Sequence, residues 1–288
     1  MINKIDSIFS SFFSDKNLKK FERIILVAAT LGFIIHLILI FLNNNGYLSL
    51  DFFKDQLFIN PISAIYTPFS FIIIYEAFLL IYYIPRSFTT AIAKQFEIMS
   101  LILIRKIFKD IPNVDLNGNW FDNGNNLQLI YDLFGVLVVF FLILLFKRLR
   151  ENLPKLPVHE NLEKFISYKK AISVLLVPTL IFLSAFSFYE WYKYTFYGLG
   201  DVANIDYLFF VDFFTILILV DVFILLISFQ YTERYSQLVR NTGFIISTIL
   251  LRLSFSAEGL TSLLLLVSGI SFGLIILLIY NNMERDTK

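Results

Sequence analysis

Two acidic side chains lie deep inside apolar stretches of this sequence. Glu76 and Asp221 each interrupt a run of hydrophobic residues, and at about 1.5 Å of rise per helical residue they fall roughly 3–6 Å to the inner side of the midpoint of a membrane span. Hydrocarbon favours a neutral carboxyl group, which changes charge when water or a cation reaches it. Proton or cation passage requires this behaviour. The alternative is a purely structural acid, hydrogen-bonded to a carbonyl or a tyrosine hydroxyl.

A second group of polar residues lies roughly 5–10 Å to the outer side of the span midpoints. It consists of His36, Arg105, Asp132, Asp212 and Arg252. A guanidinium keeps its proton, so an arginine at this depth needs a carboxylate partner. We expect Arg105 to pair with Asp132 and Arg252 with Asp212, as ion pairs that gate a pathway. The arginines could instead lock helices together or extend towards the membrane surface. His36 is a candidate for the transport pathway or an ordinary packed histidine.

Two segments that lie 147 residues apart have nearly the same sequence, Ile98–Phe108 and Ile245–Phe255. Six of their eleven positions are identical, and Ser100 and Ser247 are among them. Each segment is also the third apolar stretch of its half of the chain. The match therefore predicts an ancestral module that occurs twice.

Composition identifies the class of protein. Hydrophobic residues make up 57% of the 288 residues and aromatic residues 18%, with a mean hydropathy of +0.72. Soluble domains contain about 45–50% apolar residues. The runs Ile24–Leu42, Leu127–Phe146 and Leu260–Tyr280 can cross a hydrocarbon layer of about 30 Å as helices. We therefore expect an all-α polytopic membrane bundle.

Eight spans are predicted, and they are arranged as two parallel repeats of four helices. The expected spans are 22–42, 63–84, 91–109, 127–146, 171–192, 206–228, 241–256 and 260–280. The third and seventh are short enough to lie along the membrane surface instead. Four helices return the chain to its starting side, so the repeats would be related by a pseudo-twofold axis along the membrane normal.

Residues outside the spans complete the predicted domain organisation. Residues 1–21 have apolar positions at helical spacing and are expected to form an amphipathic helix at the membrane surface. The repeats cover 22–150 and 171–288, and 151–170 is expected to be a charged cytoplasmic linker.

Charge distribution predicts the orientation. With the N-terminus inside, 18 of the 24 lysines and arginines fall on the cytoplasmic side. Both termini are then cytoplasmic, in what we expect to be a bacterial inner membrane.

Several classes of function lack their sequence signals. The chain has no cysteine and two histidines, so we expect no metal site and no cofactor. It contains no phosphate-binding loop, zinc-protease motif or potassium-channel filter, and no arrangement of nucleophile and base. A net charge of +1 gives no reason to expect nucleic acid as a partner.

The sequence therefore predicts a channel or transporter for a small ion or proton rather than an enzyme. Glu76 and Asp221 would carry the translocated charge. The alternative is a non-catalytic membrane subunit or scaffold that binds a partner protein, and an enzyme acting on lipid is a weaker third option. The expected partners are the lipid bilayer and either a second copy or another membrane subunit.

Overall fold

A computed structural model describes residues 2–47, 60–111, 114, 120, 123–151, 153, 161–197, 205–232, 234–257 and 259–285. These residues are helical almost throughout. The helices in this part of the chain are α1 (Ile2–Phe12), α2 (Asp15–Asn44), the 3₁₀ helix η2 (Pro61–Ile65), α3 (Tyr66–Tyr83), α4 (Phe88–Asp110), α5 (Gly124–Glu151), α6 (Asn161–Tyr197), α7 (Ile205–Phe229), α8 (Tyr235–Ser256) and α9 (Gly259–Arg285).

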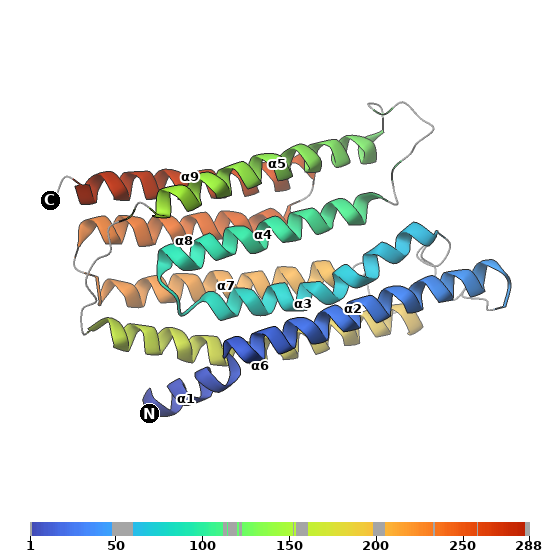
Figure 1. Ribbon diagram of the computed structural model, residues 1–288, viewed down its shortest axis with the longest axis horizontal. Helices are drawn as coiled ribbons and strands as arrows, with labels where there is room; N and C mark the ends of the chain where they lie inside the picture. Colours follow the sequence, from blue (N-terminus) through green and yellow to red (C-terminus); the bar gives the residue numbers. More distant parts are fainter. Residues whose placement is uncertain are drawn as a thin grey trace.

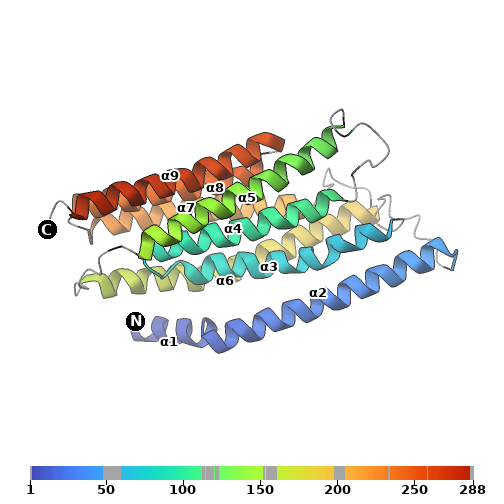
Figure 2. The ribbon, with the colours of Figure 1, turned by 45° about the horizontal axis from the view of Figure 1, so that its top comes forward.

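Helices α2 to α9 run side by side along one axis (Figures 1 and 2). Seven helical segments in the described residues are long and apolar enough to cross a membrane, which is the build of an integral membrane protein. Helix α4 is the additional long helix and carries more charged residues. It lies within the bundle between α3 and α5, with its axis aligned with theirs (Figure 1). The expected third and seventh spans are therefore helices aligned with the bundle.

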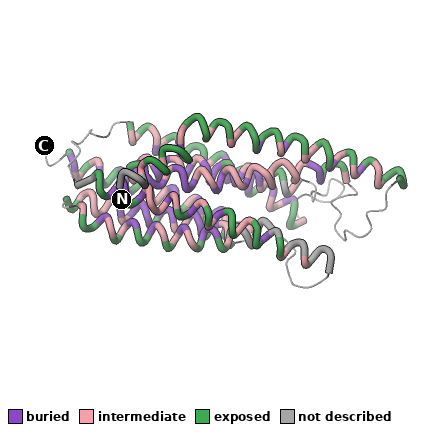
Figure 3. Tube along the Cα trace, turned by 90° about the horizontal axis from the view of Figure 1, so that it is seen from below, coloured by how far each residue is buried: buried purple, intermediate pink, exposed green. Residues whose placement is uncertain are grey.

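Burial follows the pattern expected of a bundle in lipid. Many large apolar side chains point away from the other helices, and Leu175, Phe182 and Phe134 are among the most exposed. Figure 3 shows exposed residues along the outer helix surfaces and buried residues on the inward-facing sides. Several phenylalanines lie in the interior, where Phe96 and Phe146 meet edge to face with ring centroids 4.9 Å apart. Phe213, Phe214 and Phe244 are also almost fully buried.

Small residues allow the closest helix contacts. The interface between α8 and α9 is the most extensive in the bundle. A Cβ atom on Gly269 would lie 3.1 Å from the Ser247 carbonyl oxygen, and one on Gly273 would lie 2.7 Å from Phe96 Cζ. Gly135 of α5 approaches Leu263 of α9 even more closely. Contacts of α4 with α8 and of α5 with α9 join the first half of the chain to the second.

The helix ends differ from two of the expected domain boundaries. The amphipathic segment expected over 1–21 ends early, because Ser14 caps a new helix by accepting a hydrogen bond from Asn17 N at 3.2 Å. Helix α1 packs beside α6, where Asp6 pairs with Lys170 at 2.8 Å. Helix α6 begins at Asn161, so the last ten residues of the expected linker are helical. The placement of α1 at a membrane surface stays a prediction.

Candidate functional site

Glu76 forms a buried ion pair with an arginine of the next helix. Its Oε2 accepts a hydrogen bond from Arg105 Nη1 at 2.7 Å, which joins the middle of α3 to α4. The Glu76 side chain is 3% exposed and the Arg105 side chain 11%. Glu76 is therefore held deep in the bundle with its charge compensated.

Asp221 forms the corresponding pair between α7 and α8. Arg252 Nη1 lies 2.7 Å from Asp221 Oδ2, and the Thr248 hydroxyl donates to the same oxygen at 2.8 Å. The side chain of Arg252 is only 1% exposed, and its Nε and Nη1 lack an aligned hydrogen-bond acceptor. The contact is therefore an attraction between charges rather than a directed hydrogen bond.

The expected partners of the two arginines were wrong. Sequence-based depths placed Arg105 with Asp132 and Arg252 with Asp212, whereas the structure places the arginines against Glu76 and Asp221. Side chains on a helix lean towards its N-terminus, and α3 and α4 are antiparallel neighbours. The arginine and the acid therefore lean towards each other along the axis, which closes a gap that was calculated from backbone positions.

The two aspartates have other environments. Asp132 is fully buried on α5, where Gln128 Nε2 donates to Oδ1 at 3.0 Å and Lys106 Nζ lies 3.6 Å from Oδ2. Asp212 lies on an exposed face of α7. Neither aspartate forms the gating pair that was expected of it.

His36 is also separate from the acids. It is 8% exposed, and its Nδ1 shares a hydrogen bond with the Thr67 hydroxyl at the start of α3. Thr67 precedes Glu76 by more than two helical turns. The structure thus brings together Glu76 with Arg105 and Asp221 with Arg252, and leaves His36 outside both pairs.

A small cavity with four polar lining residues lies beside Asp221. Its volume is about 30 Å³, and it is lined by residues of α4, α6, α7 and α8 and of the turn between α3 and α4. Asp221, Thr248, Lys169 and Gln95 are its polar lining residues. Gln95 is 5% exposed, and its Oε1 has no hydrogen-bond partner. The cavity therefore connects a carboxylate, an ammonium and an unpaired acceptor.

Sequence reasoning missed Lys169. It was assigned to the solvated linker, yet it is 3% exposed inside the bundle. Its Nζ donates to the Arg86 carbonyl oxygen at 2.5 Å and lies 4.9 Å from the ring centre of Phe88 and 5.5 Å from that of Phe165. A signal existed, because Lys169 follows Phe165 by four residues and so shares its helix face.

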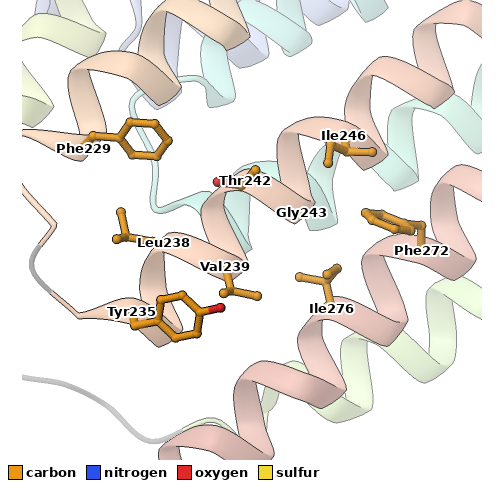
Figure 4. A pocket seen from close by; sticks show the side chains of 9 residues that line it. All are labelled: Phe229, Tyr235, Leu238, Val239, Thr242, Gly243, Ile246, Phe272 and Ile276. Atoms are coloured by element: carbon orange, nitrogen blue, oxygen red, sulfur yellow. The ribbon is translucent and has the colours of Figure 1, made fainter.

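A larger hollow on the bundle has a different character. It has a volume of about 470 Å³ and lies where the end of α7 meets α8 and α9. Figure 4 shows that its walls are mainly apolar, with Val239 and Ile246 on α8 near Ile276 and Phe272 on α9, and Leu238 nearer to Phe229 of α7. None of its lining residues carries a charge. None of the four residues of the buried ion pairs lines it.

The described residues contain no group of three or more histidine, aspartate or glutamate side chains placed to hold a metal ion. Comparisons with protein-family models, with curated proteins and with solved structures give no match for this chain.

Proposed function

We propose that the protein transports a small ion or proton across the membrane, and that Glu76 and Asp221 are the acids whose charge changes during transport. The observation that carries the proposal is the cavity at Asp221, which brings water-sized space to a carboxylate in the middle of the bundle. A buried acid–arginine pair is costly to form and costly to leave half-broken. The equilibrium between the formed and the broken pair therefore responds strongly to protonation of the acid or to a competing ion.

The two pairs support a duplicated architecture. Each joins the second and third helices of a four-helix unit, and in each the separation between arginine nitrogen and acid oxygen is 2.7 Å. We propose that the units α2–α5 and α6–α9 are related by a pseudo-twofold axis along the membrane normal, as an even number of helices per unit requires. Alternating access would then use both pairs as switches that open one at a time.

Flux measurements in proteoliposomes test the proposal. Purified protein is reconstituted into liposomes, and uptake of protons, Na⁺, K⁺ and Cl⁻ is measured for the wild type and for Glu76→Gln combined with Asp221→Asn. We expect the wild type to carry one of these ions and the double variant to lose that flux. Flux that survives in the folded double variant would remove both acids from the mechanism.

The second candidate is a non-catalytic subunit or scaffold of a membrane complex. The observation in its favour is the dry packing of phenylalanines such as Phe96, Phe146 and Phe244 at the centre of the bundle. In this case both ion pairs lock neighbouring helices. Mild-detergent purification would then retain a stoichiometric partner protein, and the reconstituted chain would carry no ion.

A further inference from the structure

We infer that the transported species is the proton, and that it reaches Asp221 from the α3–α4 turn through Lys169 and a water molecule held in the cavity beside Gln95. The inference rests on the proposed transport function and assigns its substrate and one side of its path.

The size of the cavity limits its contents. A buried water needs about 10–15 Å³ of such space and between two and four polar partners. The cavity offers about 30 Å³, together with the Lys169 ammonium, Gln95 Oε1 and the Asp221 carboxylate. A water in this position would satisfy the Gln95 oxygen, which otherwise has no hydrogen-bond partner. A metal ion that keeps its hydration shell does not fit.

The charges around the cavity disfavour a bare ion. A dehydrated cation would meet Lys169 from α6 and, behind Asp221, the guanidinium of Arg252 from α8. A small anion would meet the Asp221 carboxylate and the Gln95 carbonyl oxygen. A proton avoids both conflicts. It is passed along the hydrogen-bonded chain by breaking one covalent bond to hydrogen and forming the next, so no separate ion has to occupy the cavity.

Two of the groups facing this space can exchange protons. Lys169 and Asp221 are the ionisable residues that line the cavity. Thr248 contributes a hydroxyl that donates to Asp221, and Gln95 contributes an uncharged amide. Arg252 lies against Asp221 but keeps its proton. The route therefore runs between one amine and one carboxylate.

The transfer step conserves charge. An N–H bond of the Lys169 ammonium breaks and the water accepts that proton. The water gives one of its own protons to Asp221, where an O–H bond forms. The buried ammonium and carboxylate become a neutral amine and a neutral acid, and Lys169 then takes a new proton from the side of the α3–α4 turn.

Neutral Asp221 no longer attracts Arg252 as an ion. The 2.7 Å contact between α7 and α8 is therefore weakened at the moment the proton arrives. This links proton uptake from one side to separation of the two helices, which would expose the acid towards the other side.

The test uses liposomes loaded with a pH-sensitive dye, with a potassium diffusion potential to drive proton movement. Lys169→Arg keeps the positive charge but cannot release a proton at neutral pH. Lys169→Met removes the charge as well. We expect both variants to lower proton flux by about tenfold or more, because each removes a proton-transfer group.

A neighbouring lysine provides the matched control. Lys170 lies one position further along α6 and pairs with Asp6 at 2.8 Å, away from the cavity. We expect Lys170→Met to leave proton flux unchanged. Ala91→Leu serves as a second variant, because Ala91 lines the cavity and the larger side chain would displace the water without changing any ionisable group.

The possible outcomes separate the inference from the proposed function. Wild-type flux of Na⁺, K⁺ or Cl⁻ without proton flux overturns the inference and leaves transport standing. No flux of any ion overturns both. Wild-type proton flux that persists in folded Lys169→Arg overturns the route, and if the Lys169 variants do not fold, persistence in Ala91→Leu has the same consequence.

Discussion

The two acid–arginine pairs have the same separation and different surroundings. Glu76 is as deeply buried as Asp221, with side chains 3% and 5% exposed, but its partner Arg105 is 11% exposed. Arg252 is 1% exposed, and its partner Asp221 also accepts a hydrogen bond from Thr248 and lines a cavity. The two pairs therefore differ in the burial of the arginine and in the polar groups that surround the acid.

The third and fourth helices of each half, α4 with α5 and α8 with α9, are joined in different ways. In the first half, α4 and α5 are linked by charges, with Glu97 and Lys147 2.8 Å apart and Asp132 and Lys106 3.6 Å apart. In the second half, α8 and α9 approach closely at glycines, and the Ser247 hydroxyl donates to the Gly269 carbonyl oxygen at 2.6 Å. Charged contacts tolerate shifts that a glycine contact does not, because close packing penalises small displacements.

Removing the acid of each pair in turn should show most strongly how the burial of its arginine affects stability. Asp221→Ala leaves a fully buried guanidinium without its counter-charge, and we expect it to lower the free energy of unfolding by about 3–5 kcal/mol. Glu76→Ala should lower it by less, because Arg105 can reach solvent or headgroups. Reversible unfolding in mixed micelles, followed by circular dichroism, measures both values. Equal losses would show that burial does not separate the two pairs.

A substitution at Gly273, where α9 packs against both α4 and α8, should have the next largest effect. Gly273→Ala places a Cβ 2.7 Å from Phe96 Cζ and 2.9 Å from Ser247 Oγ, so we expect a loss of about 1–3 kcal/mol from overpacking. The matched control is Gly124→Ala at the start of α5, where nothing lies within 4 Å of the added atom. The same unfolding assay applies, and a loss in the control as large as that at Gly273 would contradict a steric cause.

Replacing the serines shared by the two similar segments should have a smaller effect on the free energy of unfolding. Ser247 donates between helices, whereas the Ser100 hydroxyl donates within its own helix to the Glu97 carbonyl oxygen at 2.7 Å. We expect Ser247→Ala to lower the free energy of unfolding by about 1 kcal/mol. Ser100→Ala should change it far less, since the helix itself already occupies that carbonyl. A larger loss at Ser100 would reverse the comparison between the halves.

Replacing the whole second pair should change stability least. Combining Asp221→Leu with Arg252→Met removes both charges together and keeps similar volume, and such replacements are often neutral or stabilising. We expect unchanged or higher resistance to unfolding together with loss of ion flux. Retained flux in this folded variant would show that the pair has no part in transport.

Local sequence predicted the helices well because hydropathy and helical spacing are properties of neighbouring residues. Segments 91–109 and 241–256 were uncertain on length and charge alone, and the bundle aligns both with their neighbours. Glu76 and Asp221 were correctly singled out as buried acids.

By itself, the sequence determined that the chain forms long apolar helices and that acids and arginines lie within those helices. Only the tertiary structure decided which charges meet. Pairing depends on which helices are neighbours, how they are rotated about their axes and how their side chains lean, and none of these is a local property. For the same reason Lys169 looked like part of a solvated linker, until the packing of α6 against the α3–α4 turn placed it inside the bundle beside Asp221.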